Sequence, residues 1–123
     1  MSESTFVDPY VSAQKTGERV VLPEPREVLL DLDTEEDWEQ MNKMRGILAG
    51  LGLYLQVVDT HPSKSGLPHR HVTLAAPRAL TPIERVALQA CLGSDRKRET
   101  LSLARIFLGD PAPATVFFEP KLP

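Results

Sequence analysis

Cysteine is almost absent from this sequence, because Cys91 is the single one among 123 residues. No intramolecular disulfide can form, which suits a reducing compartment such as the cytoplasm. Cys91 falls within an apolar helical pattern, so we interpret it as a small core residue and not as a nucleophile. A long apolar run is also missing, and we therefore expect neither a signal peptide nor a transmembrane helix.

An excess of positive charge is missing as well, since the formal net charge is -3. This balance argues against a general nucleic-acid coat protein, although it is compatible with a local basic patch. The length corresponds to one domain and is sufficient to bury a core without disulfides. The composition therefore predicts one cytoplasmic globular domain that does not bind membranes.

The periodicity of apolar residues predicts a domain over residues 27–123, preceded by an extended or mobile arm over residues 1–26. Within the arm, the stretch "RVVL" is a candidate for pairing with a sheet edge. In chain order, the domain has a predicted strand at 27–33, a helix at 34–52, strands at 53–60 and 69–76, helices at 81–93 and 94–109, and a strand at 115–120. Thr34 and Thr81 each precede an acidic residue by three positions, the spacing of a capping box at a helix start.

The order of these elements matches the split βαβ arrangement, which is also called ferredoxin-like or RRM-like. Right-handed crossovers would place the first and third strands at the centre of a four-stranded, mostly antiparallel sheet, with the helices on one face. We therefore predict an α+β fold of this architecture. The other face of the sheet stays open unless the amino-terminal arm folds across it.

The residues on this open face follow from the alternation of side chains along a strand. In each central strand, the apolar residues take the face toward the helices and leave the polar ones outside. The last strand adds an aromatic and an acidic side chain to the same face. This alternation therefore places six side chains on one surface: Asp31, Asp33, His69, His71, Phe117 and Glu119.

Two carboxylates on this surface are suited to a divalent metal. Asp31 and Asp33 stand two positions apart, so both can share a hard cation such as Mg²⁺ or Mn²⁺ and leave positions for substrate phosphates. A pair of such ions is a common device for phosphoryl transfer. Across the sheet, His71 is positioned to bind a phosphate oxygen. The hairpin turn adds backbone N–H groups, the Ser65 hydroxyl and the Lys64 ammonium for the same purpose.

Two short motifs resemble a known family. The stretch "LLDLD" followed by "SGLPHRHV" resembles the first two motifs of archaeo-eukaryotic-type primases and primase-polymerases. Members of that family carry Asp-x-Asp or Asp-x-Glu at the end of a strand, then a Ser-Gly turn that leads to a histidine on the next central strand. Ser65 and His71 have the spacing of six found in some members. The catalytic core of the family has a modified RRM-like fold.

The resemblance implies a role for each matched residue. Asp31 and Asp33 would bind the divalent metals, and His71 would contact a nucleoside triphosphate. The implied reaction is nucleotidyl transfer, in which the metals activate a 3′-hydroxyl and stabilise the leaving pyrophosphate. The family also needs a third acidic residue on a neighbouring strand, for which Glu119 is our candidate, and related sequences can carry an aspartate at the position of Ser102. The stretch "ALQACLGSDRKRETLSLAR" resembles small phage and plasmid primase-like proteins, which implies a role in DNA replication.

A module that binds single-stranded nucleic acid without chemistry is an alternative. Phe117 would then stack on a base, as aromatic side chains of RRM sheets do, or it is a core residue if the arm covers the sheet. Arg70 and the run Arg96, Lys97 and Arg98 would contact phosphates and make binding depend on salt. The competing interpretation of the basic run is an ordinary solvated helix face.

Two further alternatives stay open. His69 and His71, joined by His61, offer part of a transition-metal site, for which zinc normally needs three or four protein ligands. We prefer the simpler interpretation, in which these are exposed histidines of a hairpin with no special role. A phage-encoded interaction protein could also use this fold to block a host factor, in which case the partner is a protein and Asp31 and Asp33 merely end a strand before a helix.

Overall fold

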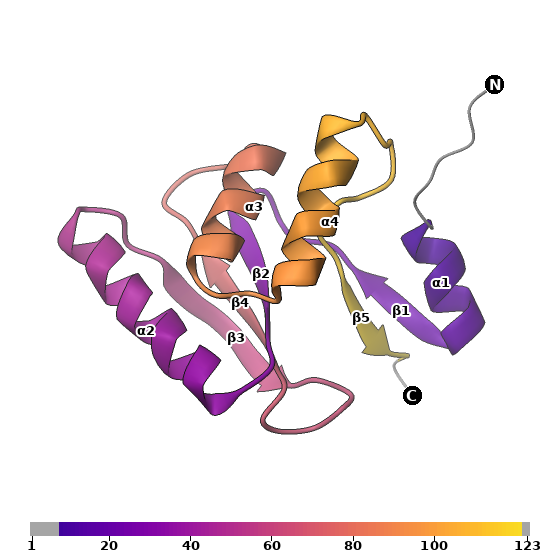
Figure 1. Ribbon diagram of the computed structural model, residues 1–123, viewed down its shortest axis with the longest axis horizontal. Helices are drawn as coiled ribbons and strands as arrows, with labels where there is room; N and C mark the ends of the chain where they lie inside the picture. Colours follow the sequence, from indigo (N-terminus) through magenta and orange to yellow (C-terminus); the bar gives the residue numbers. More distant parts are fainter. Residues whose placement is uncertain (1–7, 122–123) are drawn as a thin grey trace.

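The computed structural model describes residues 8–121 and has an α+β architecture. Within these residues, four helices accompany five strands that form two antiparallel sheets. The helices are α1 (Pro9–Thr16), α2 (Glu35–Gly50), α3 (Pro82–Cys91) and α4 (Arg96–Phe107). The strands are β1 (Glu18–Val21), β2 (Glu27–Leu32), β3 (Gln56–Pro62), β4 (Arg70–Ala75) and β5 (Phe117–Pro120). Figure 1 shows β1 and β5 side by side, next to the sheet formed by β2, β4 and β3.

Every element predicted between residues 27 and 120 is present, with small changes at the ends. Both capping boxes are confirmed, since the hydroxyls of Thr34 and Thr81 each accept a hydrogen bond from the backbone three residues later. The hairpin turn starts at Ser63 and not at His61, because β3 continues to Pro62. Gly66 has a φ of 78° in this turn, a conformation that glycine adopts at no steric cost.

The hydrophobic core lies between the three-stranded sheet and helices α2 and α3, which Figure 1 shows on the same face of it. Its fully buried members come mainly from β2, β4 and α2, as the alternation of apolar residues in both strands predicts. They include Val28, Leu30, Leu32, Met41, Val72, Leu74 and Leu92. Trp38 packs against this core from α2 and is partly exposed. Cys91, by contrast, is exposed at the end of α3, so its assignment to the core was wrong.

The larger sheet has the predicted order of its first three strands but lacks the fourth. β4 lies at the centre between β2 and β3, and both pairings are antiparallel. β5 pairs with β1, so the four strands predicted as one sheet are divided between two sheets. The first predicted strand, β2, therefore has a free edge where a fourth strand was expected.

Side chains from α3 and α4 close this edge of β2. The Leu29 backbone N–H donates to Gln89 Oε1 at 3.0 Å, and Arg98 Nη1 donates to the Leu29 carbonyl at 2.7 Å. Two residues further along β2, the Asp31 N–H donates to the Ser94 hydroxyl at 2.9 Å. Buried backbone groups need such partners, because an unpaired one costs free energy comparable to a lost hydrogen bond.

Further contacts complete this closure at both ends. Arg85 Nε donates to the Glu27 carbonyl at 2.8 Å, and the Asp95 N–H donates to the Asp31 carbonyl at 2.8 Å. Covering an edge strand with a helix also prevents it from pairing with another chain. The α3–α4 pair thus occupies the position that the RRM-like prediction gave to the last strand.

Within residues 8–26, a helix and a strand replace most of the predicted extended or mobile arm, and residues 1–7 of that arm lie outside the described part of the chain. Asp8 caps α1 by accepting a hydrogen bond from the Tyr10 N–H. β1 then pairs with β5 in an antiparallel register from Glu18 opposite Pro120 to Val21 opposite Phe117. The pairing suggested for "RVVL" is therefore present, with β5 as the partner. Among residues 8–121, no helix combines the length and the apolar character needed to cross a membrane.

Candidate functional site

A row of polar side chains crosses the face of the larger sheet that lies away from the core. Asp31 of β2, His71 of β4 and His61 of β3 stand opposite one another in the strand register. His71 Nε2 lies 3.9 Å from Asp31 Oδ1. The predicted alternation therefore places Asp31 and His71 on the same face, and His61 joins them because β3 continues to Pro62, beyond its predicted end at residue 60.

This face is covered and not open. The Phe117 ring of β5 stacks on the His71 imidazole, with the ring centroids 4.0 Å apart and the planes at 2°. Phe117 is 3% exposed and Glu119 is 5% exposed. The alternation along β5 correctly placed both side chains on the side of the strand that faces His71. The expectation of an open surface was wrong, since β5 covers this face of the sheet.

Glu119 connects the two histidines of the row. Its Oε1 atom lies 2.7 Å from His61 Nε2 and 3.1 Å from His71 Nδ1. On its other side, His61 Nδ1 lies 2.6 Å from Asp59 Oδ2. Partial burial disfavours the charged form of His61, but the hydrogen bonds with Asp59 and Glu119 outweigh it and raise the pKa of the imidazole. Glu119, predicted as the third carboxylate beside Asp31, thus belongs to a histidine cluster.

Asp95 takes the place beside Asp31 and Asp33. One carboxylate oxygen from each of the three lies within 4.8 Å of the others. Partial burial and the hydrogen bond with Asp95 raise the pKa of Asp33, against a weaker opposing effect of His69. Burial also disfavours the charged form of Asp95, but hydrogen bonds from the backbone N–H groups of Arg98 and Lys97 and from Asp33 together outweigh this and lower its pKa. The negative charges of Asp31 and Asp95 also raise the pKa of Asp33, and a bound cation would relieve this repulsion.

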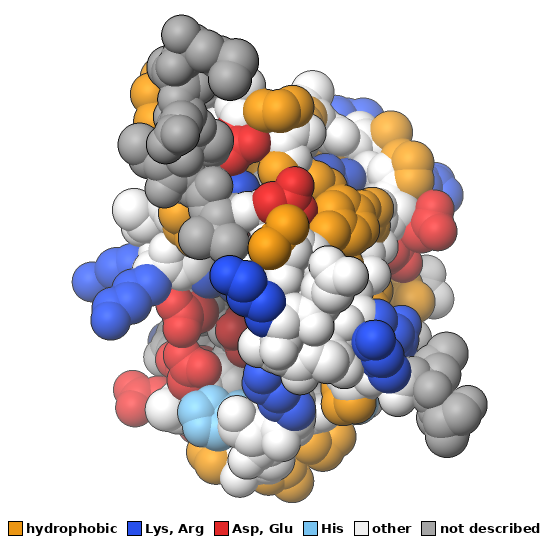
Figure 2. Space-filling view, turned by 90° about the vertical axis from the view of Figure 1, so that its right-hand side faces the viewer, with side chains coloured by type: hydrophobic (Ala, Val, Ile, Leu, Met, Phe, Trp, Pro, Cys, Tyr) orange, Lys and Arg blue, Asp and Glu red, His pale blue; other side chains and the backbone are white. Residues whose placement is uncertain are grey.

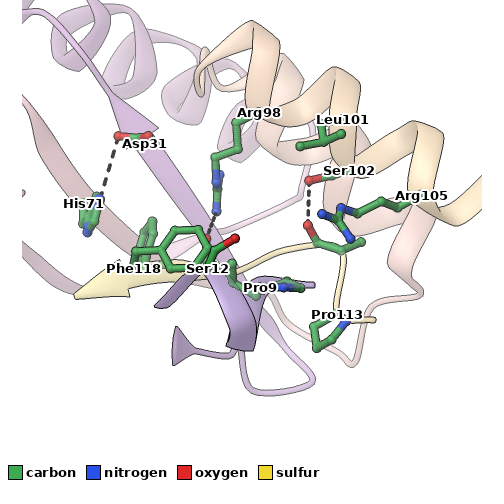
Figure 3. A pocket seen from close by; sticks show the side chains of 13 residues that line it. Pro9, Ser12, Asp31, His71, Arg98, Leu101, Ser102, Arg105, Pro113 and Phe118 are labelled. Atoms are coloured by element: carbon green, nitrogen blue, oxygen red, sulfur yellow. Dashed lines mark hydrogen bonds and ion pairs between the residues drawn. The ribbon is translucent and has the colours of Figure 1, made fainter. Parts of the chain in front are cut away.

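A cavity of about 260 Å³ opens beside Asp31 and His71 (Figure 3). Ser102 and Arg105 of α4 line it on another side, as do residues of α1 and β5. Ser102 donates to the Ala114 carbonyl at 2.8 Å, so this position stabilises the connection to β5.

Arg98 has an internal role in place of the predicted nucleic-acid contact. Besides Leu29, its guanidinium donates to the Val116 carbonyl at 3.1 Å and pairs with Glu99 at 2.6 Å. It also lies over the Phe117 ring, 5.3 Å from the centroid. These contacts hold β5 against α4 and β2, and they occupy the guanidinium.

Arg96 and Lys97 are exposed in the first turn of α4. They line a wider hollow of about 750 Å³, which also includes Asp33 and Asp95. The acidic cluster therefore stands between this hollow and the smaller cavity at Asp31. Figure 2 shows acidic side chains gathered beside a histidine on one face of the molecule, with lysine and arginine side chains near them.

The remaining predicted residues are engaged elsewhere. Lys64, at the tip of the hairpin, forms an ion pair with Glu18 of β1 at 2.8 Å, which lowers the pKa of the Glu18 carboxyl. The Ser65 backbone N–H donates to the Ser63 hydroxyl at 3.3 Å within the turn. Arg70 pairs with Glu35 at 2.6 Å and its guanidinium lies 4.6 Å from the centroid of the Trp38 ring. His69 faces Asp33 at 3.3 Å.

Sequence reasoning missed Asp59 and Asp95 as members of these two clusters. Asp95 follows Gly93 and Ser94 directly before a helix, so its position as an N-cap was a usable signal. Asp59 stands two residues before His61, and the same strand alternation that placed the other residues would have found it.

Comparisons of the chain with models of protein families, with curated proteins and with solved structures found no match.

Proposed function

We propose that this protein is a primase-like nucleotide-binding protein that holds a divalent cation, Mg²⁺ or Mn²⁺, on Asp31, Asp33 and Asp95. The observation that carries the proposal is the convergence of these three carboxylates within 4.8 Å. Oxygen donors of this kind are the ligands that both cations prefer. The reaction we infer is nucleotidyl transfer in phage or plasmid DNA replication, on a domain related to the RRM-like fold.

The arrangement of the strands supports the fold part of the proposal. In an RRM-like sheet the first, third and second strands of the split βαβ unit are neighbours in that order, and β2, β4 and β3 have the same order. The departure is confined to the last strand, whose place beside β2 is taken by α3 and α4.

The chemistry of the three carboxylates supports the cation. Asp33 has a raised pKa because it is partly buried and shares a hydrogen bond with Asp95. A raised carboxyl pKa means that negative charge is disfavoured at this point, and a metal ion would offset that charge. When bound, the cation would neutralise phosphate charge and favour ionisation of an attacking hydroxyl.

The surrounding residues indicate where a triphosphate would lie. The hollow of about 750 Å³ is within the usual range for ligand pockets, whereas the cavity at His71 is smaller than that range. Arg96 and Lys97 line the hollow beside Asp33 and Asp95 and supply positive charge for phosphate oxygens. His71 then acts as a positioning residue, with its Nε2 atom facing Asp31.

The alternative of base stacking loses its main support from the same geometry. Phe117 is 3% exposed, with His71 stacked on its ring and Arg98 over it, so a base would have to displace one of them. Binding of nucleic acid through the exposed basic residues remains compatible with the proposal, because a template or primer has to approach the same hollow.

The test is a calorimetric titration of Mn²⁺ together with a nucleoside triphosphate. Wild-type protein should bind the nucleotide only when Mn²⁺ is present, and Asp31→Asn/Asp33→Asn and Asp95→Asn should each lose that binding. Glu36→Gln is the matched control, since Glu36 is an exposed acid on α2 outside the cluster. Equal binding in the wild type and the Asp31→Asn/Asp33→Asn variant would contradict the proposed site. A positive result leads to a primer-synthesis assay with the same four proteins.

A further inference from the structure

A second group of potential metal ligands lies about the middle strand of the sheet, on the other side of His71 from the acidic cluster. It consists of His61 on β3, His71 on β4 and Glu119 on β5, and one donor atom of each lies within 4.8 Å of the others. His71 and Glu119 are buried, and the side chain of His61 is 38% exposed. Nitrogen and oxygen donors from three separate strands therefore meet at one partly accessible point.

The surroundings of His61 are unusual for a neutral imidazole. Both of its ring nitrogens face a carboxylate oxygen, Asp59 at 2.6 Å from Nδ1 and Glu119 at 2.7 Å from Nε2. A neutral imidazole donates from one nitrogen and presents a lone pair at the other. One of these two close contacts therefore needs an additional positive charge, supplied by a second proton or by a metal ion.

We propose that His61 Nε2, His71 Nδ1 and Glu119 bind a transition-metal ion of the Zn²⁺ class. In this arrangement the Nδ1–H of His61 donates to Asp59, the usual carboxylate support of a histidine that ligates a metal. Two histidines with one glutamate form a known ligand set for zinc, with a fourth position left for water. This site is distinct from the Asp31, Asp33 and Asp95 cluster and does not depend on the nucleotide proposal.

Two of the three distances between ligand atoms fit such an ion after a small adjustment, and the donor atoms of the two histidines lie within 4.8 Å of each other. Bonds of about 2.0–2.1 Å in a tetrahedral site place the ligand atoms roughly 3.3 Å apart. Glu119 Oε1 is 3.1 Å from His71 Nδ1 and 2.7 Å from His61 Nε2, so about half an ångström of opening is needed. His61 has room to move because it is partly exposed. Imidazole donors also favour zinc, copper or nickel over magnesium.

The consequence for the fold is a link between the two sheets. β5 has β1 as its ladder partner and does not pair with β4 or β3. An ion on His61, His71 and Glu119 would join β5 to both of those strands at one point. Binding should therefore stabilise the folded protein as well as load the site.

Cobalt is the probe for the first experiment, because Co²⁺ in a zinc site has visible absorption bands. We expect the purified protein to develop these bands, to bind one Co²⁺, and to lose the bands when Zn²⁺ is added. His61→Ala and Glu119→Gln should weaken binding by more than a hundredfold, beyond the 10–100-fold loss typical of removing an outer hydrogen-bond partner. Asp59→Asn should fall within that 10–100-fold range.

Two variants act as matched controls. His69→Ala removes a histidine of the same hairpin that faces Asp33 and not Glu119, and it should leave the cobalt bands unchanged. Asp95→Asn, which changes the acidic cluster without touching a neighbour of His71, should also leave them unchanged. Cobalt binding that survives His61→Ala but disappears in the aspartate variant would place the ion on the acidic cluster and overturn the inference, as would the absence of bands in the wild type.

Thermal unfolding gives a second readout that does not depend on a correctly folded Glu119 variant. At a hundredfold excess over its dissociation constant, Zn²⁺ should raise the Tm of the wild type by roughly 10 °C. Asp59→Asn changes an exposed residue and should fold normally, and its Tm should rise less at the same zinc concentration. An equal rise in the wild type and in His61→Ala would show that zinc binds elsewhere, and this result would also overturn the inference.

Discussion

Replacing Gln89 by leucine tests how the free edge of β2 is closed. Gln89 of α3 is 0% exposed. Its Oε1 accepts from the Leu29 N–H at 3.0 Å, and its Nε2 donates to Glu99 Oε1 at 2.6 Å and to the Thr115 hydroxyl at 3.3 Å. Leucine has a similar volume, so the substitution removes these hydrogen bonds without opening a large cavity.

The magnitude follows from the groups that lose a partner. The buried Leu29 N–H is left unpaired, which costs about 1–3 kcal/mol. Glu99, 3% exposed, loses a charge-assisted hydrogen bond worth about 1.5–3 kcal/mol, while its contact with Arg98 at 2.6 Å remains. Burial of the leucine side chain offsets about 1.5–2 kcal/mol of this. We expect a net loss of roughly 1–4 kcal/mol in the free energy of unfolding.

Urea unfolding followed by circular dichroism measures this loss, and hydrogen exchange of the Leu29 amide locates it. Gln40→Leu is the matched control, because Gln40 is exposed on α2 and should change stability by no more than about 0.5 kcal/mol. A loss below about 1 kcal/mol in Gln89→Leu, with unchanged protection of the Leu29 amide, would refute the reasoning. It would mean that another group, such as the backbone of β5, can pair with β2.

Three smaller predictions concern the turn, a helix start and a surface ion pair. Gly66→Ala should destabilise the protein by about 1 kcal/mol in urea unfolding, because φ is 78° there while nothing blocks a Cβ. Thr34→Ala should cost about 1 kcal/mol, since it removes the hydroxyl that accepts from the Asp37 N–H. Arg78→Ala should raise the pKa of Glu84 from about 2 toward its ordinary value in an NMR titration. Because the pKa of Glu84 is lowered in the folded protein, its carboxylate stabilises the fold at pH values above the pKa that it has in the unfolded chain. This stabilisation is lost as the pH falls toward 2. In Arg78→Ala the folded-state pKa is higher, so the stabilisation should be lost completely at a higher pH.

The local structure of this chain was predictable because its signals are local. Thr34 and Thr81 cap their helices as the sequence indicates. Alternation along the strands also placed Phe117 and Glu119 on the side of His71. The alternation of side chains shows which residues share a side of a strand, however, and it does not show whether another segment covers that side. The covering by β5 was therefore outside what the pattern could predict.

The position of β5 outside the larger sheet was not predictable for a different reason. In the sequence, Gln89 and Ser94 read as parts of a helix and its end, and Arg98 reads as the last member of a basic run. Each has a long-range partner on β2 or β5, 60 to 69 positions away for the β2 contacts. Such contacts leave no periodic signal, because a single side chain makes each one.

The closed edge of β2 and the acidic cluster are consequences of the same contacts. Asp95 lies beside Asp31 because its N–H donates to the Asp31 carbonyl at 2.8 Å, while Ser94 accepts from the Asp31 N–H at 2.9 Å. A fourth strand paired with β2 would have to use these same backbone groups of Asp31, and it would displace Asp95 from the cluster. Because α3 and α4, and not β5, lie beside β2, the third carboxylate next to Asp31 and Asp33 is that of Asp95. Glu119, on the displaced strand, is left to join the histidines, so one change of topology accounts for both clusters of potential ligands.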